Sequence, residues 1–443
     1  MELTRRRFLI ASGASAATCM LDLSGVRAQA CRSQLPFVIT VQASGAWDPT
    51  FLIDPVTDNA AFTPFRAAHV KTVGQIRYLP FDVSTGVVPY RVGADAQDFF
   101  AKHGSRMLVF NGVDNATVNH DVGPRVAFTG SARDALPTLS GLAAGLQGRQ
   151  LPLAMFVSGG FASTGGLVPI TRGASLNLLR ELASPNRDAI QGAALRLREA
   201  TRARDARRVA AATSPRADEA FHFRSGALDD RFAEIADALQ TASKVRTPNS
   251  FADAASGMLA LMRAGATAAG HLTTGGFDTH DAHDDLHNGQ RVALRTMLTG
   301  LDYIIDAVAA DPVLRGRGAL IVVGSDFGRT TYNDKGGKDH WPITSMMAIG
   351  IGANVEAQIG GARVIGATEP TGRAGVSALP VKVVDGRSVV AASGEPGSFK
   401  LTPAHVNLAL RNALGLCESD MPGVAFERFR LKVAPQEPMP LVS

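Results

Sequence analysis

The chain has 443 residues, of which 45% are hydrophobic and 19% charged, and its net charge is +5. This apolar fraction can form a sizeable core, which excludes a wholly disordered or low-complexity protein. Three cysteines are too few for a disulfide-rich scaffold. Residues 1–30 contribute +2 of the net charge, and no basic-aromatic pattern accompanies the remainder, so we expect no nucleic-acid partner.

The N-terminus has the pattern of an export signal. The basic run Arg5-Arg6-Arg7 precedes a short, mildly apolar stretch, which ends in Val26-Arg-Ala-Gln-Ala30. A charged start, an apolar region and small residues at the end are typical of a secretory signal peptide, and the arginine run resembles the twin-arginine consensus. We predict that residues 1–30 are a signal peptide, that the twin-arginine machinery exports the chain, and that the mature protein is periplasmic or secreted.

Cleavage after Ala30 would leave Cys31 at the new N-terminus. We expect no lipid anchor there, because Gln29 stands where a lipidation box has a small residue. Cys31 and Cys417 could pair in an oxidising compartment, but the sequence does not decide whether they do. No later segment has the roughly 18 uninterrupted apolar residues that a membrane span requires.

Short β-rich apolar runs alternate with longer helical patterns along the remaining chain. This alternation predicts an α/β fold, with a mostly parallel central sheet flanked by helices. The expected strands are 37–42, 106–111, 152–157, 269–274, 319–324 and 346–350. The expected helices are 95–103, 176–182, 188–211, 228–243, 251–264, 285–309 and a last one from Pro403 to about Leu414. We expect a single domain over residues 31–443, with a helical insertion around 159–265.

Side chains that can bind a metal follow the predicted strands, at the edge of the sheet where α/β proteins present their sites. Asp48 follows the first strand and a glycine-containing turn, although an Asp before Pro49 also starts turns well. His120 lies in a polar turn after the second strand, before a helix N-terminus that suits an anionic substrate. A lone His in such a turn is often a cap or a surface residue.

The densest cluster of such side chains follows the strand at 269–274 and contains Asp278, His280, His283 and His287. Mixed carboxylate and imidazole ligands suit zinc, manganese or iron better than calcium. Asp278 and His280 lie on one face if the strand continues, whereas His283 and His287, four residues apart, would share a helical face. A hydrophilic helix start with a capping Asp would explain some of these residues but not all.

A second carboxylate and imidazole follow the strand at 319–324. Asp326 stands at its end, and a polar loop leads to His340. Arg329 and Lys338 in this segment are cations that can hold phosphate or sulfate oxygens, or else they are solvated loop charges.

The order of these motifs resembles the DUF1501 family, exported proteins of uncharacterised function. The resemblance rests on Gly276-Phe-Asp-Thr-His280, Ser325-Asp-Phe-Gly-Arg-Thr330 and Asp339-His-Trp341. The family is similar to the alkaline phosphatase and sulfatase superfamily, which implies an alkaline-phosphatase-like fold for nearly the whole mature chain. The two-metal site of that superfamily, carried over to this sequence, has as its ligands Asp48, Asp278, His280 or His283, His340 and, for the second ion, Asp326.

The chain departs from the superfamily pattern at two positions. The nucleophile, counted back from Gly130, falls on His120 instead of a Ser, Thr or modified Cys. The residue after Asp326 is Phe327, where the superfamily has His. Both changes are explained if His120 replaces the lost imidazole as a metal ligand and a metal-bound water is the nucleophile.

The sequence therefore predicts an exported, metal-dependent hydrolase of phosphate or sulfate esters with one or two ions of zinc, manganese or iron. Its expected substrate is a small anionic ester or an anionic glycan, and its expected catalytic residues are His120, Arg329 and Lys338. The alternative is a non-catalytic periplasmic binding or assembly protein that keeps a metal for stability. A third alternative is a structural protein without metal, in which the clustered Asp and His side chains are ordinary polar surface residues.

Overall fold

The computed structural model describes residues 35–81, 98–133, 135–173, 232–372, 374–416, 429–431, 434 and 439–441. The predicted signal peptide, Cys31 and Cys417 lie outside these residues, as do the helices expected at 176–182 and 188–211. None of the helices in the described part of the chain combines the length and the apolar character needed to cross a membrane.

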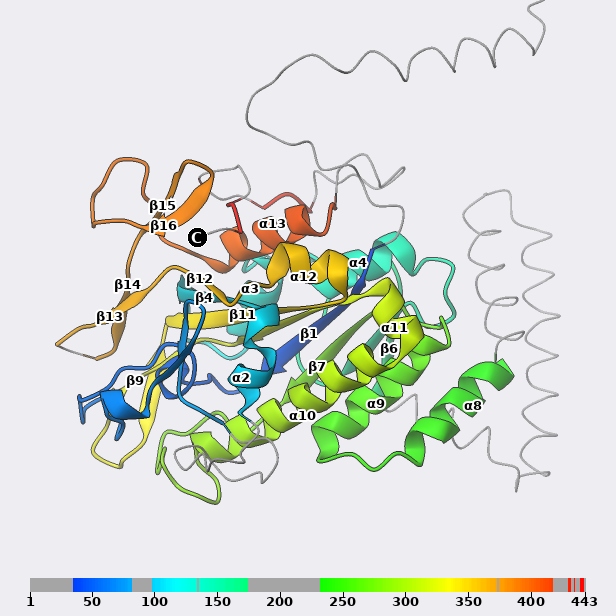
Figure 1. The fold of residues 1–443 in the computed structure, drawn as a ribbon, viewed down its shortest axis with the longest axis horizontal. Helices are drawn as coiled ribbons and strands as arrows, with labels where there is room; N and C mark the ends of the chain where they lie inside the picture. Colours follow the sequence, from blue (N-terminus) through cyan, green and yellow to red (C-terminus); the bar gives the residue numbers. More distant parts are fainter. Residues whose placement is uncertain are drawn as a thin grey trace, which may run out of the picture.

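An eight-stranded sheet in the order β12-β4-β11-β8-β1-β7-β5-β6 forms the centre of the fold (Figure 1). The strands are β1 (Phe37–Ala43), β4 (Met107–Asp114), β5 (Met155–Ser158), β6 (Ile170–Arg172), β7 (Ala269–Thr274), β8 (Ala319–Ser325), β11 (Ile343–Ile351) and β12 (Arg363–Ile365). All neighbouring strands are parallel except β11, which is antiparallel to both β4 and β8. The predicted α/β fold with a mostly parallel sheet is confirmed.

The six predicted strands all form, with ends that differ by a few residues. The two strands of the central sheet that the sequence did not reveal, β6 and β12, have three residues each and lie at the edges of the sheet. Runs this short carry almost no periodicity, and they form because a neighbouring strand offers its backbone groups. Strand β6 belongs to the segment expected as a helical insertion, so the described part of that segment is not wholly helical.

Helices cover both faces of the sheet (Figure 1). The first layer contains α8 (Phe232–Ser243), α9 (Ser250–Arg263), α10 (Gln290–Ala310) and α11 (Pro312–Arg317). The second layer contains α3 (Gly123–Thr129), α4 (Leu139–Gln147), α12 (Ala353–Ile359) and α13 (Pro403–Ala413). Ile39 and Val41 of β1 pack into the core of the first layer, and Val38 packs into that of the second. Both faces of β1 are covered, and all seven of its residues are buried. The sequence is mostly apolar, and its two polar residues, Thr40 and Gln42, have hydrogen-bond partners.

Short elements connect these layers. They are the helices η1 (Pro49–Phe51), η2 (Ala67–His69), α2 (Phe99–His103) and η3 (Gly104–Arg106), and the hairpins β2 (Lys71–Val73) with β3 (Ile76–Tyr78), β9 (Gly328–Tyr332) with β10 (Lys338–Trp341), β13 (Thr368–Pro370) with β14 (Val376–Ala378), and β15 (Val381–Val384) with β16 (Arg387–Val390). The β9–β10 hairpin replaces the flexible loop expected after Asp326. It pairs Lys338 with Tyr332 and His340 with Arg329 across the two strands.

One predicted helix begins later than expected. Helix α10 starts at Gln290 instead of residue 285, because the Asp285 carboxylate accepts the backbone N–H groups of His287 and Asn288 and closes a turn there. His283 and His287 therefore do not share a helical face, and that expectation is corrected. Strand β7 also ends at Thr274, so Asp278 and His280 lie in a loop and not on one face of a strand.

The close packing of α4 on the segment around Ser163 gives a stability prediction. A Cβ added at Gly141 would lie 2.0 Å from the Ser163 carbonyl oxygen, and a backbone atom cannot move aside easily. We expect Gly141→Ala to lower the free energy of unfolding by about 1–3 kcal/mol. The matched control is Gly316→Ala in α11, where an added Cβ meets nothing within 4 Å and should stabilise by about 0.5–1 kcal/mol. Urea unfolding of both variants checks this, and equal effects would contradict the packing argument.

Candidate metal centre

Three imidazoles and a carboxylate meet beyond the carboxyl ends of β7 and β8. His120 comes from the turn before α3, and the others come from two chain segments that we call the first arm (residues 277–283) and the second arm (residues 333–341). His120, Asp278 and His340 offer ligand atoms that all lie within 4.8 Å of one another. His280 joins them, with its Nε2 2.9 Å from Nε2 of His340 and 3.1 Å from Oδ1 of Asp278.

The second ring nitrogen of each histidine is held by an acceptor outside the cluster. Nδ1 of His120 lies 2.8 Å from Oδ2 of Asp326, and Nδ1 of His280 lies 2.8 Å from Oδ1 of Asp339. Nδ1 of His340 lies 3.1 Å from the carbonyl oxygen of Val118. A carbonyl or carboxylate oxygen can only accept, so each Nδ1 carries the proton and donates it. Each neutral imidazole then has its lone pair on Nε2.

These lone pairs point at one another, which the bare protein tolerates poorly. Nε2 of His340 is 3.1 Å from Nε2 of His120 and 2.9 Å from Nε2 of His280, and neither nitrogen of a neutral pair can donate. The pKa of His340 is lowered, first by burial and then by the nearby Arg329 charge, which favours its neutral form. Imidazole nitrogens with an oriented outer partner are the usual metal-binding arrangement. The residues present therefore fit a divalent cation.

Asp278 completes the donor set and is held in its ionised form. Its Oδ1 is 2.7 Å from a guanidinium nitrogen of Arg329 and 3.2 Å from Nε2 of His340. Partial burial favours a higher pKa for Asp278, but the Arg329 guanidinium outweighs burial and lowers the pKa below its ordinary value. Asp278 therefore presents a negative charge to the three imidazoles at neutral pH.

One side of the cluster is apolar and the other faces solvent. The buried ring of Phe327 lies 4.8 Å from the His120 ring and 4.5 Å from the His340 ring, centroid to centroid. The side chains of His120 and Asp278 are 37% and 48% exposed. Structural zinc sites have closed coordination, whereas catalytic sites keep an open position. The exposure of His120 and Asp278 leaves this cluster accessible to solvent.

Asp326 lies in an outer shell instead of contacting the cluster centre. Its carboxylate accepts hydrogen bonds from Nε2 of Gln42 at 2.9 Å and from the backbone N–H of Gly45 at 3.0 Å, besides the one from His120. Its side chain is 2% exposed. The sequence grouped Asp326 with the metal ligands, and in the structure its oxygens are already engaged. It orients His120.

Arg329 is also turned inward. Its side chain is not exposed, and it donates to the carbonyl oxygens of Ala46 (2.9 Å), Lys338 (2.8 Å) and Phe277 (2.7 Å), and to that of Gly45. The sequence suggested that Arg329 binds an anionic substrate. Its hydrogen bonds instead link both arms and hold Asp278, so we assign it a positioning role.

Asp48, His283 and Lys338 lie apart from the cluster of imidazoles and form what we call the anchor cluster. Asp48 Oδ2 accepts a hydrogen bond from Lys338 Nζ and one of 3.1 Å from His283 Nε2, and none of the three side chains has exposed surface. Burial alone would raise the pKa of Asp48, but Lys338 and His283 outweigh it and hold that pKa below its ordinary value. The Lys338 ammonium is buried and paired with Asp48, so an ester in solvent cannot reach it. We therefore assign Lys338 no contact with substrate.

Three groups at the site were not among the predicted site residues. Asp339 holds His280, the Val118 carbonyl holds His340, and Gln42 holds Asp326. Asp339 directly precedes His340, so its place in the sequence was a usable signal. A backbone carbonyl such as that of Val118 has no side-chain signature. The exposed His287 and the buried His271 do not join the cluster.

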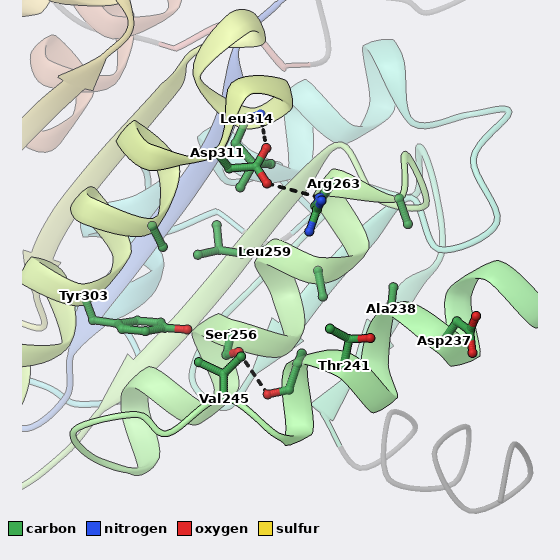
Figure 2. A pocket seen from close by; sticks show the side chains of 14 residues that line it. Asp237, Ala238, Thr241, Val245, Ser256, Leu259, Arg263, Tyr303, Asp311 and Leu314 are labelled. Carbon is green, nitrogen blue, oxygen red and sulfur yellow. Dashed lines mark hydrogen bonds and ion pairs between the residues drawn. The ribbon is translucent and has the colours of Figure 1, made fainter.

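Two other features of the described residues could be mistaken for the site. His103, Asp302 and Asp306 also offer clustered ligand atoms, but Lys102 Nζ lies 2.7 and 2.6 Å from the two carboxylates and supplies their counter-charge. Figure 2 shows a largely apolar groove of about 430 Å³ between α8, α9, α10 and α11. None of its lining residues belongs to the imidazole cluster, and an ion pair between Arg263 and Asp311 borders it.

Comparison with known proteins identifies a family and nothing more specific. Residues 128–385, more than half of the chain, match the family described as "Protein of unknown function (DUF1501)". The matched region contains Asp278, His280 and His340 but not His120. No curated protein and no solved structure matches the chain.

The hydrogen bond from His120 to Asp326 predicts a loss of metal affinity without loss of a ligand. In Asp326→Asn, one carboxylate oxygen becomes an NH₂ group, which cannot accept from His120, Gln42 or Gly45. We expect the Kd for Zn²⁺ or Mn²⁺ to rise about 10- to 100-fold, measured by competition with a chromophoric chelator. The control is Asp281→Asn on the first arm, an exposed carboxylate whose replacement should leave Kd within about twofold. Unchanged affinity in Asp326→Asn would refute the outer-shell role.

Buried His271 predicts how stability depends on pH. Burial lowers the pKa of His271 to about 3, and its Nδ1 lies 2.8 Å from Oγ1 of Thr40. The unfolded chain binds a proton below about pH 6.5, but the folded protein does not until about pH 3. Stability should therefore fall as pH decreases through this window, by on the order of 1 kcal/mol per pH unit.

The variant His271→Asn should show a shallower loss of unfolding free energy between pH 6.5 and pH 4 than the parent, measured by urea titration. His287→Asn removes an exposed histidine and should keep the parent slope. Identical slopes in the parent and His271→Asn would show that His271 does not carry this pH dependence.

Proposed function

The chain belongs to the DUF1501 family, and we propose that it is an exported metal-dependent hydrolase of phosphate or sulfate esters that binds one divalent cation. The observation that carries the proposal is the convergence of three Nε2 atoms and the Asp278 carboxylate, with every Nδ1 already engaged. Such a donor set suits zinc, manganese or iron. Export rests on the basic and apolar pattern of residues 1–30.

The chain's own residues supply orientation and charge at this site. His120, His340 and Asp278 hold the cation, and His280 is a fourth donor. Asp326, Asp339 and the Val118 carbonyl accept from the three Nδ1 atoms and so aim the three Nε2 atoms at the centre. A divalent cation in such a site polarises an ester oxygen and lowers the pKa of water, so that no Ser or Thr nucleophile is required.

One cation is favoured over two because the remaining predicted ligands are already engaged. Asp326 accepts from His120, and Asp48 is neutralised by Lys338 and His283. The exposed side chains of the cluster leave room for a substrate on the side opposite Phe327. The choice of phosphate or sulfate esters rests on the resemblance to the alkaline phosphatase and sulfatase superfamily, which is an argument by analogy.

A second candidate is a non-catalytic, metal-stabilised binding or assembly protein. The observation that favours it is Phe327, which packs against His120 and His340 where the superfamily has another imidazole. In the described residues, no hydroxyl or thiol side chain contacts the cluster. On this account the metal would raise the melting temperature, and no ester would be turned over.

The deciding experiment measures metal content and turnover together. The mature protein, purified folded and without chelator, should contain about one equivalent of zinc, manganese or iron. The double variant Asp278→Ala, His340→Ala should lose this metal, because it removes two of the three closest donors. His287→Ala, a histidine outside the cluster, should retain it.

Activity is tested on 4-nitrophenyl phosphate, bis(4-nitrophenyl) phosphate and 4-nitrophenyl sulfate. We expect hydrolysis of at least one ester, lost in the double variant and retained in His287→Ala. Bound metal with no turnover of any ester would support the second candidate. An absence of bound metal, with none taken up on titration, would remove both metal-based candidates.

A further inference from the structure

We propose that the anchor cluster of Asp48, Lys338 and His283 positions both arms of the metal centre, so that Lys338 sets metal affinity without contacting the metal. The inference rests on the metal centre proposed above. Lys338 is in this view a positioning residue and not a catalytic one.

The anchor cluster allows its members little freedom. The Lys338 and Asp48 side chains have no exposed surface, and Oδ1 of Asp48 also accepts from the backbone N–H of Thr50 at 3.0 Å. The Lys338 ammonium lies 4.7 Å from the centre of the Phe51 ring and 5.0 Å from that of Tyr332. Separating a buried pair leaves an uncompensated charge in the interior, which is strongly unfavourable. The ammonium therefore stays in one place.

The first arm is tied to this cluster through Thr279, which stands between the ligands Asp278 and His280. Oγ1 of Thr279 is 2.7 Å from Nδ1 of His283. Because Nε2 of His283 donates to Asp48, its Nδ1 accepts the Thr279 hydroxyl proton. Gln290 completes the link, since its Nε2 donates to Thr279 Oγ1 at 3.1 Å and its Oε1 accepts from the backbone N–H of Asp48 at 3.2 Å.

The second arm contains Lys338 itself, directly before Asp339 and two residues before His340. Its backbone N–H donates to the Thr279 carbonyl at 3.0 Å, and the backbone N–H of His283 donates to the Gly336 carbonyl at 2.8 Å. Gly337 lies so close to the first arm that an added Cβ would be 1.7 Å from the His280 carbonyl oxygen. The two arms are thus joined along their backbones, directly over the buried pair.

This arrangement explains why a fully buried lysine stands next to a solvent-exposed ligand set. Asp278 and His280 lie on a loop and His340 lies on the short strand β10, whereas a metal site requires its donors to be held closely. The anchor cluster provides an interior attachment point for both loops at once. Its removal should loosen the donor set even though every metal-binding atom is still present.

The test uses Lys338→Met in the mature protein, which keeps much of the apolar stem and removes the charge. We expect the Kd for Zn²⁺ to rise by at least about tenfold, as found for outer-shell partners of metal ligands. We also expect the visible absorption of the Co²⁺-loaded protein to change in position or intensity, because the donor geometry changes. A purely structural role would lower Tm and leave both readouts at their wild-type values.

The matched control is Lys382→Met, which breaks the ion pair of Lys382 in β15 with Glu395, outside both arms and outside every candidate ligand group in the described residues. It should lower Tm while Kd and the Co²⁺ spectrum stay the same. Because Lys338→Met leaves Asp48 buried without its partner, that variant could fail to fold. The double variant Asp48→Asn, Lys338→Met removes both charges and is expected to fold, still with a Kd at least about tenfold above wild type.

The outcomes separate this inference from the proposed function. If the wild-type protein binds no metal, the proposed metal centre fails. If the wild-type protein binds metal and either Lys338 variant shows wild-type Kd and Co²⁺ spectrum, the inference about the anchor cluster is overturned and the metal centre stands. Weakened binding in both Lys338 variants, with wild-type binding in Lys382→Met, supports the inference.

Discussion

The buried guanidinium of Arg329 is the interaction on which the site depends. Its nitrogens donate to carbonyl oxygens of Gly45, Ala46, Phe277 and Lys338 and to the Asp278 carboxylate. An interior cation with an unsatisfied N–H would be strongly unfavourable. The chain therefore has to bring the turn after β1, the first arm and the second arm to one point. The donor set for the metal is built on the arms that this constraint brings together.

Arg329 contacts both polar clusters, which differ in exposure and in role. The exposed cluster of His120, Asp278, His280 and His340 directs its lone pairs and charge toward a common centre, which a cation and a substrate can reach from solvent. The anchor cluster neutralises its own charge within the interior and presents nothing to solvent. A hydrolytic site requires the first property, and precise placement of donors on loops requires the second.

The sequence was most informative where the signal is local. The apolar runs around Ile39, Phe156 and Ile321 predicted strands, because strands buried on both faces of a sheet are mostly apolar. Five of the predicted metal-centre residues, His120, Asp278, His280, Asp326 and His340, do meet at one edge, as expected for side chains that follow neighbouring strands. The start of α10 was missed because the Asp285 turn competes with the helix through side-chain to backbone hydrogen bonds.

The sequence by itself determined the fold class and the residue types available at the edge of the sheet, since both follow from periodicity and from position after a strand. Only the tertiary structure decided which of those residues join the imidazole cluster and which join the buried anchor cluster. Asp48 and Asp278 both follow strands and look alike in the sequence, yet one pairs with a buried ammonium and the other faces solvent. The difference arises because Lys338, nearly 300 residues after Asp48, has its side chain in the interior. A bulge between Lys338 and His340 on β10 lets the side chain of His340 lie on the solvent side. Pairings between distant segments depend on burial and register, which no local pattern encodes.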